Sequence, residues 1–98
     1  MTLALIGLAG REVVRSNFVQ AFKLSQEAVD ASDGPDTRLM RGRTAIFLAQ
    51  AVSGSGDAQR ARELFSAARK DLESIPKENQ FYTTARELLS NPVLSREL

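Results

Sequence analysis

The sequence predicts an all-α protein made of antiparallel helix pairs, with about five helices in total. Apolar residues recur at spacings of three and four along most of its 98 residues, as on one face of a helix. Clusters of Gly, Pro, Ser and Asp divide this pattern at residues 32–36 and 53–57. No segment of comparable length alternates apolar and polar residues as a strand does. Because a chain of this length holds one small core, we expect a single domain. Its parts in chain order are a first helix pair (1–32), a second helix pair (37–75) and a C-terminal capping helix (78–90), together spanning 1–98.

The first predicted helix covers residues 2–14 and is apolar on almost every side. Such a helix is buried in its own domain or covered by another subunit. The run from Leu3 to Ala9 has the length of a signal-peptide core, but its first basic residue, Arg11, follows the run instead of preceding it. A signal peptide is therefore not favoured. No apolar run approaches the ~18 residues that cross a bilayer, so we expect no membrane partner.

The second predicted helix runs from about residue 18 to Ala31. The polar segment Arg15-Ser16-Asn17 separates it from the first helix, and Ser16 or Asn17 can cap its start. Neither Gly nor Pro enforces this break. One continuous helix over residues 2–31 is the alternative.

The third and fourth predicted helices flank the Ser53 to Asp57 turn. The third begins after the loop Ser32-Asp33-Gly34-Pro35-Asp36, where Gly can end a helix and Pro cannot continue one. We expect Asp36 or Thr37 to cap it and Val52 to end it. Asp57 is expected to cap the fourth helix, which ends near Ser74 because Ile75 precedes Pro76.

Small residues mark a close contact between the third and fourth helices, since an antiparallel pair needs small side chains where the two axes approach. The residues on the two facing sides are Ala45, Ala49, Val52, Ala61, Phe65 and Ala68. We therefore predict a structural role for Ala61, and likewise for Gly56 in the turn.

The fifth predicted helix runs from about Glu78 to Leu89. Asn91-Pro92 stops it, and residues 93–98 can add one terminal turn.

Composition excludes several classes of function. Thirteen Lys and Arg against 12 Asp and Glu leave a net charge of +1, which gives no general attraction to nucleic acid. The chain contains no Cys, which favours a reducing compartment, and we expect a cytoplasmic protein. It also contains no His, the commonest general base and metal ligand. The carboxylates Asp33 and Asp36 lie in a loop with no apolar pocket implied around them. We expect no catalytic residues, no metal and no cofactor.

The second helix pair resembles a tetratricopeptide repeat, a 34-residue helix–turn–helix unit. The residues that carry the resemblance are Leu48-Ala49, Gly56-Asp57, Ala61, Phe65 and Ala68. An earlier stretch echoes them 40 residues before, with Leu8-Ala9, Ala21 and Ala28. The echo is partial, because Ser25 stands in place of Phe65 and Ser16 in place of Gly56. The resemblance implies that the helix pairs stack as a short tetratricopeptide-like superhelix; a generic antiparallel bundle is the alternative.

The resemblance also implies a protein-interaction module, whose partner binds the surface made by the first helix of each pair. The corresponding residues here are Ile6, Gly10, Val13, Ile46, Gln50 and Ser53. Some members of the family clamp a carboxylate there with Lys and Asn, which are absent from these positions. We therefore expect an apolar helix or peptide as the partner. Stable stacks usually contain about three repeats, so we also expect a homodimer or higher homo-oligomer.

Three arginines near the start of the third helix, Arg38, Arg41 and Arg43, form the candidate anion site. Free amides at a helix N-terminus favour anions, and the guanidinium group suits phosphate or carboxylate. The alternative is a solvated face, or salt bridges to Asp33 and Asp36. If the segment contacts phosphates, the function is instead that of a helical DNA-binding or transcription-regulatory domain. The charges of the fourth helix, in which basic residues such as Arg69 mix with Glu63 and Asp71, are typical of a solvated surface.

Overall fold

The computed structural model describes residues 2–90, with the side chains of residues 2–6 and 14 excepted. This part of the chain contains five α-helices and no strand, which confirms the predicted all-α class. The helices are α1 (Thr2–Val14), α2 (Phe18–Ala31), α3 (Pro35–Gly54), α4 (Ala58–Glu73) and α5 (Tyr82–Leu89). The terminal turn predicted for residues 93–98 lies outside the described residues.

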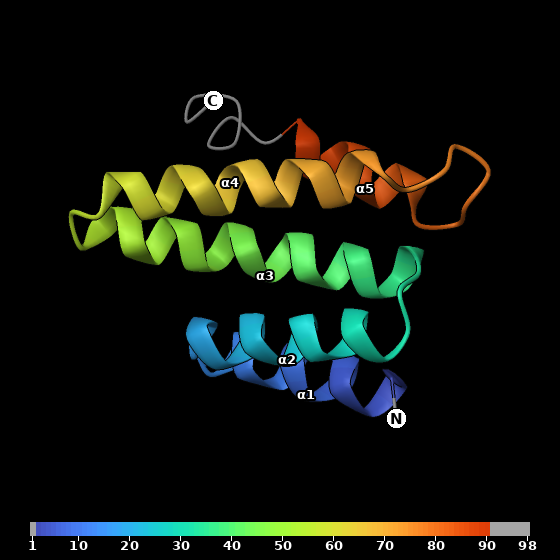
Figure 1. The fold of residues 1–98 in the computed structure, drawn as a ribbon, viewed down its shortest axis with the longest axis horizontal. Coiled ribbons are helices and arrows are strands. Elements are labelled where there is room, and N and C mark those ends of the chain that lie inside the picture. The colour runs from blue at the N-terminus through green and yellow to red at the C-terminus, as the bar shows by residue number, and fades with distance from the viewer. Residues whose placement is uncertain (1, 91–98) are drawn as a thin grey trace.

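Consecutive helices run antiparallel and lie in layers, with α1 and α2 at one end of the stack and α4 and α5 at the other (Figure 1). Each helix packs against the next one along the chain, and α1 also contacts α3. The principal extents are 35 × 27 × 20 Å. The first helices of the two pairs, α1 and α3, are therefore neighbours.

The turn between α1 and α2 separates two helices, so the alternative of one continuous helix is wrong. Ser16 has a φ of 61° and reverses the chain in the left-handed region. Its N–H donates to the carbonyl of Val13 at 2.9 Å, and the N–H of Asn17 donates to the carbonyl of Glu12 at 2.8 Å. These two bonds satisfy carbonyls at the end of α1. The chain reverses here without Gly or Pro.

The turn between α3 and α4 has the same hydrogen-bond pattern, 40 residues later. Gly56 has a φ of 95°, and its N–H donates to the carbonyl of Ser53 at 3.0 Å. The N–H of Asp57 donates to the carbonyl of Val52 at 3.1 Å. The carboxylate of Asp57 accepts from the N–H of Arg60 at 3.1 Å, which confirms that Asp57 caps α4. Helix α3 ends at Gly54, two residues later than predicted.

Helix α3 begins two residues earlier than the predicted caps allow. Gly34 is the N-cap and Pro35 the first helical residue, because the fixed φ of Pro is suited to a first turn. Thr37 lies inside that turn, where its hydroxyl oxygen accepts from the N–H of Gly34 at 3.0 Å. The same hydroxyl lies 2.8 Å from the carbonyl oxygen of Ser32, to which it can donate. The prediction that Asp36 or Thr37 is the N-cap is therefore wrong.

Helix α5 is shorter than predicted and begins at Tyr82 instead of Glu78. A hydrogen-bonded turn takes up the preceding residues, with the N–H of Asn79 donating to the carbonyl of Pro76 at 3.0 Å. The side-chain oxygen of Asn79 accepts from the N–H of Phe81 at 2.9 Å. A side chain that bonds to the nearby backbone competes with helix formation, which explains the late start.

The core lies between α3, α4 and α5 and confirms the predicted small-residue contact. Its members include Ala45, Ala49, Ala61, Phe65 and Ala68. Val52, also predicted in the contact, is half-buried at its edge. Helices α3 and α4 also approach closely at Gly42, where an added Cβ would lie 3.0 Å from Cγ of Leu72. The sequence analysis did not identify Gly42.

Candidate partner-binding surface

Four of the six predicted partner-binding residues lie on accessible parts of the neighbouring helices α1 and α3. Gly10 and Val13 on α1 are half-buried, whereas Gln50 and Ser53 on α3 are exposed. We call these four residues the α1–α3 surface. The side chain of Ile6 lies outside the described residues.

Ile46 does not belong to the α1–α3 surface, so its prediction as a partner-binding residue is wrong. Only 5% of it is exposed, and it is part of the core that α3 shares with α4 and α5. The tetratricopeptide resemblance implies a partner-facing position for Ile46, one helical turn before Gln50 on α3. In the folded chain the packing of α4 covers that turn and leaves Gln50 exposed.

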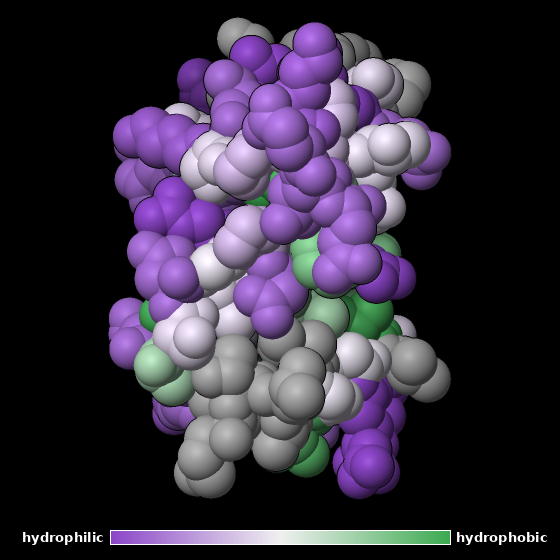
Figure 2. Space-filling view, turned by 90° about the vertical axis from the view of Figure 1, so that its right-hand side faces the viewer, coloured by the Kyte–Doolittle hydropathy of each residue, from purple (hydrophilic) through white to green (hydrophobic). Residues whose placement is uncertain are grey.

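Two large apolar side chains are exposed near the α1 and α2 end of the stack. Leu8 on α1 is 42% exposed and Val19 on α2 is 67% exposed. Leu8 belongs to the predicted helix over residues 2–14 that is apolar on almost every side, whereas no sequence pattern singled out Val19. Figure 2 views one side of the stack, toward the ends of its helices; hydrophilic residues cover most of the upper half, and hydrophobic residues reach the surface in small areas at mid-height and below.

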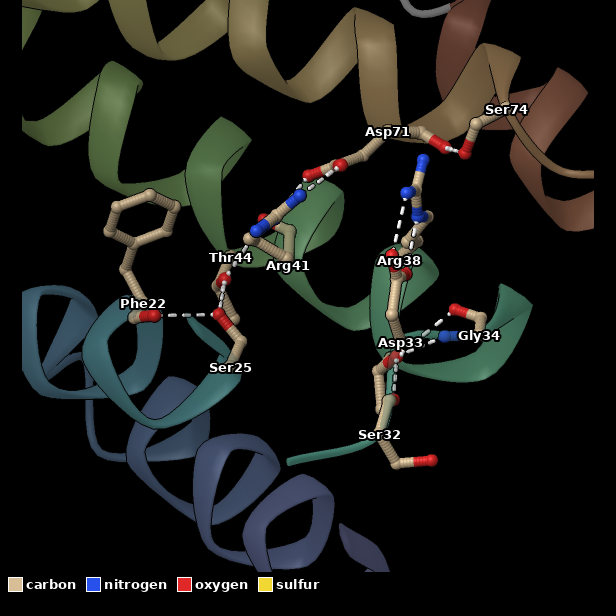
Figure 3. A network of polar contacts seen from close by, with 11 residues as sticks. Phe22, Ser25, Ser32, Asp33, Gly34, Arg38, Arg41, Thr44, Asp71 and Ser74 are labelled. Carbon is tan, nitrogen blue, oxygen red and sulfur yellow. Dashed lines mark hydrogen bonds and ion pairs between the residues drawn. The ribbon is translucent and has the colours of Figure 1, made fainter. Parts of the chain in front are cut away.

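The ring of Phe18 packs on that of Phe47 between α2 and α3. The ring centroids are 5.5 Å apart and the planes differ by 10°, a stacked arrangement. A pair of buried hydroxyl groups, Ser25 Oγ and Thr44 Oγ1, lies 2.8 Å apart between the same two helices (Figure 3). Both residues are fully buried. These contacts fix the position of the first helix pair on the second.

The predicted anion site is divided between two carboxylates of the same chain. Arg38 donates through Nε and Nη2 to the two carboxylate oxygens of Asp33, at 2.6 and 2.8 Å (Figure 3). Hydrogen bonding from Arg38 holds the pKa of Asp33 below its ordinary value. This confirms the salt-bridge alternative for Asp33. The carboxylate of Asp36 instead accepts from the N–H of Thr37 at 2.9 Å.

The second arginine, Arg41, pairs with Asp71 across the contact between α3 and α4. Its Nε and Nη2 atoms each donate to one carboxylate oxygen at 2.7 Å (Figure 3). The side chain of Asp71 is 7% exposed and that of Arg41 is 27% exposed. Hydrogen bonding to Asp71 raises the pKa of Arg41. The mixed charges of α4 predict a solvated surface for Asp71, and this prediction is wrong because α3 covers its side chain.

The third arginine, Arg43, is exposed and makes no ion pair within residues 2–90. The three guanidinium groups therefore do not act together. Arg38 and Arg41 each face a carboxylate, so an approaching phosphate would have to compete with Asp33 and Asp71. No observation on this segment favours a DNA-binding function.

Within the described part of the chain, His, Cys, Asp and Glu form no group of three or more that could hold a metal ion. None of the helices described between Thr2 and Leu89 has the length and apolar character needed to cross a membrane. Searches against protein-family models, curated proteins and solved structures found no match to this chain.

Proposed function

We propose that the chain is a protein-interaction module of the tetratricopeptide-like kind, which binds an apolar helix or peptide on the α1–α3 surface in the cytoplasm. The supporting observation is that the two helix pairs share one turn geometry at an offset of 40 residues and leave α1 and α3 in contact. This is the arrangement expected when repeated helix pairs stack with their first helices side by side.

The composition of the α1–α3 surface explains the class of partner. Gly10 has no side chain, and Val13, Gln50 and Ser53 carry no charge. A partner can therefore approach α1 closely without leaving a charge unpaired. The amide of Gln50 and the hydroxyl of Ser53 supply hydrogen bonds at the edge of the contact.

The proposal includes self-association through the first helix pair. Leu8 on α1 and Val19 on α2 are large apolar residues that the fold leaves exposed, and contact with a second copy would remove their apolar area from water. A second copy can make such a contact around a two-fold axis, because the same surface then meets itself.

A display selection tests the proposed binding. A library of 15-residue peptides is selected on the immobilised full chain, and the enriched peptides are measured by fluorescence anisotropy. We expect peptides with an apolar helical stripe, whose binding falls at least tenfold in Gln50→Arg and Ser53→Arg. The matched control is Arg62→Gln, on the exposed side of α4, which should bind as the wild type does. Peptides that bind equally to all four proteins would contradict the proposal.

A further inference from the structure

A polar hollow lies between the C-terminal halves of α4 and α5, away from the α1–α3 surface. It has a volume of about 300 Å³ and is lined by Arg69 and Glu73 of α4, Arg86 and Leu89 of α5, and Ser90. Two guanidinium groups from different helices thus border one space. The inference drawn from it does not depend on the proposed function.

The Nε–H group of Arg69 lacks an acceptor in this hollow. The Nε atom is buried and has no hydrogen-bond partner, and it is the one buried side-chain nitrogen or oxygen in this condition within the described chain. Glu73 Oε1 forms an ion pair with this atom at 3.7 Å, beyond hydrogen-bond distance, and the Arg69 side chain as a whole is 43% exposed. A buried donor without an acceptor is costly, so a native structure usually provides one as protein, water or ligand.

Two other arginines of this chain show which group can accept hydrogen bonds from the Nε side of a guanidinium group. Arg38 and Arg41 each direct Nε and Nη2 at one carboxylate, with all four distances between 2.6 and 2.8 Å. A carboxylate matches this edge of the guanidinium group because its two oxygens accept two parallel hydrogen bonds. Arg69 presents the same Nε donor, but its ion pair with Glu73 at 3.7 Å does not include a hydrogen bond.

The charge in the hollow fits one negative charge. Arg69 and Arg86 contribute two positive charges and Glu73 one negative charge, which leaves a net charge of +1. The hydroxyl of Ser90 donates to the carbonyl of Arg86 at 2.9 Å and is already used. Leu89 supplies an apolar wall, which strengthens electrostatic interactions beside it. A group with one negative charge neutralises this net charge.

We propose that this hollow binds one carboxylate group, which accepts the Nε–H hydrogen bond of Arg69 and lies within the field of Arg86. The carboxylate belongs to an acidic side chain of a bound peptide or to a small carboxylic acid. Both sources present the same group to the two arginines. The binding residues lie on α4 and α5, so this contact can form whether or not the α1–α3 surface is occupied.

The Nε–H resonances of the arginines report the binding directly in ¹⁵N-labelled full-length protein. The chain is titrated with sodium acetate, as the small acid, and with a capped peptide holding one Glu, at constant ionic strength set with sodium chloride. We expect the Arg69 Nε–H signal to move downfield and to saturate with both probes. The Nε–H signals of Arg38 and Arg41 should stay in place, because their carboxylate partners are intramolecular. Saturation with the peptide alone would assign the site to peptides, and saturation with acetate alone to small acids.

Two substitutions separate a carboxylate site from a surface charge. Arg86→Gln should weaken the binding of acetate roughly fivefold and Glu73→Gln should strengthen it by a similar factor, since each changes one charge beside the ligand. The control is Arg62→Gln, which changes an exposed residue of α4 outside the hollow and should not alter the binding of acetate. The proposal is overturned if the Arg69 signal moves linearly without saturation, or if inorganic phosphate saturates it and acetate does not. Unchanged Arg41 signals verify that each variant is folded.

Discussion

Asp71 and Arg41 form an ion pair whose acidic member is almost completely buried. Asp71→Ala removes the acceptor and leaves the guanidinium group of Arg41 at the helix contact without its partner. Breaking a buried pair in this way is expected to cost about 3 kcal/mol of unfolding free energy. Urea denaturation followed by circular dichroism measures the loss.

The exposed pair of Arg38 and Asp33 is the internal control for this experiment. Its side chains are 36% and 50% exposed, so solvent screens their attraction. Asp33→Ala should therefore lower the urea midpoint much less than Asp71→Ala does. Equal losses in the two variants would show that the Arg41–Asp71 pair does not stabilise the contact between α3 and α4.

Ala61 tests the small-residue contact between the same helices. It is fully buried against the α3 side of the core, so Ala61→Leu overpacks the contact and should cost on the order of 1–3 kcal/mol. Ala58→Leu, on the exposed start of α4, is the matched control and should change stability little. A urea midpoint unaffected by Ala61→Leu would mean that the two helices can separate there without penalty.

At the residue scale, one of these two contacts could be predicted from the sequence. The contact at Ala61 was predictable, because small residues recur at helical spacing on both sides of one short turn. The pairing of Arg41 with Asp71 could not be predicted, since 30 residues separate the two and α4 carries many charges of both signs. Only the packing of α3 on α4 shows which acid becomes buried.

At the scale of elements, the two hairpin turns differ in the residue that adopts positive φ. Ser16 occupies this conformation at 61°, which costs energy for a residue with a Cβ, whereas Gly56 adopts 95° freely. Ser16→Gly should therefore raise the unfolding free energy by roughly 0.5 kcal/mol, and Gly56→Ala should lower it by about 1 kcal/mol. Thermal unfolding by calorimetry resolves the two signs.

A glycine two residues earlier provides the control for the turn. Gly54 ends α3, and like Gly56 it has open space where a Cβ would be added. Gly54→Ala should be neutral or slightly stabilising, since alanine favours a helix. If Gly56→Ala were equally harmless, the positive φ would not be required for the turn.

The number and order of helices could be predicted from periodicity and turn residues, but two boundaries could not. The start of α5 depends on the side-chain bond of Asn79 to the backbone, which competes with helix. The break at Ser16 carries no Gly or Pro, so the sequence left one long helix open as an alternative. The chain forms two helices instead of one because α2 packs back against both α1 and α3.

At the scale of the whole molecule, exposed Leu8 predicts that two copies associate. Sedimentation equilibrium at micromolar concentration should give the mass of a dimer or higher oligomer for the wild type. Leu8→Lys places a charge in the proposed contact and should give a monomer with unchanged helicity. A wild type that is already monomeric, or a variant that remains associated, would contradict self-association through α1.

The candidate site was predictable only in part at this scale. The pairing of α1 with α3 follows from stacking two similar hairpins, and it leaves Gly10, Val13, Gln50 and Ser53 accessible. The burial of Ile46 in the core could not be predicted, because one side of α3 contributes to the α1–α3 surface and the other packs against α4. A periodic pattern identifies which face of a helix is apolar, but it does not show how much of the helix surface a neighbouring helix covers.

Backbone amide mapping tests most directly the central claim that partners bind the α1–α3 surface. The ¹⁵N-labelled chain is titrated with an enriched apolar peptide, and the amide shifts are plotted along the sequence. We predict that the largest shifts cluster around Gly10 and Val13 on α1 and around Gln50 and Ser53 on α3, with little change in the exposed half of α4. Shifts confined to α4 and α5 would contradict the account.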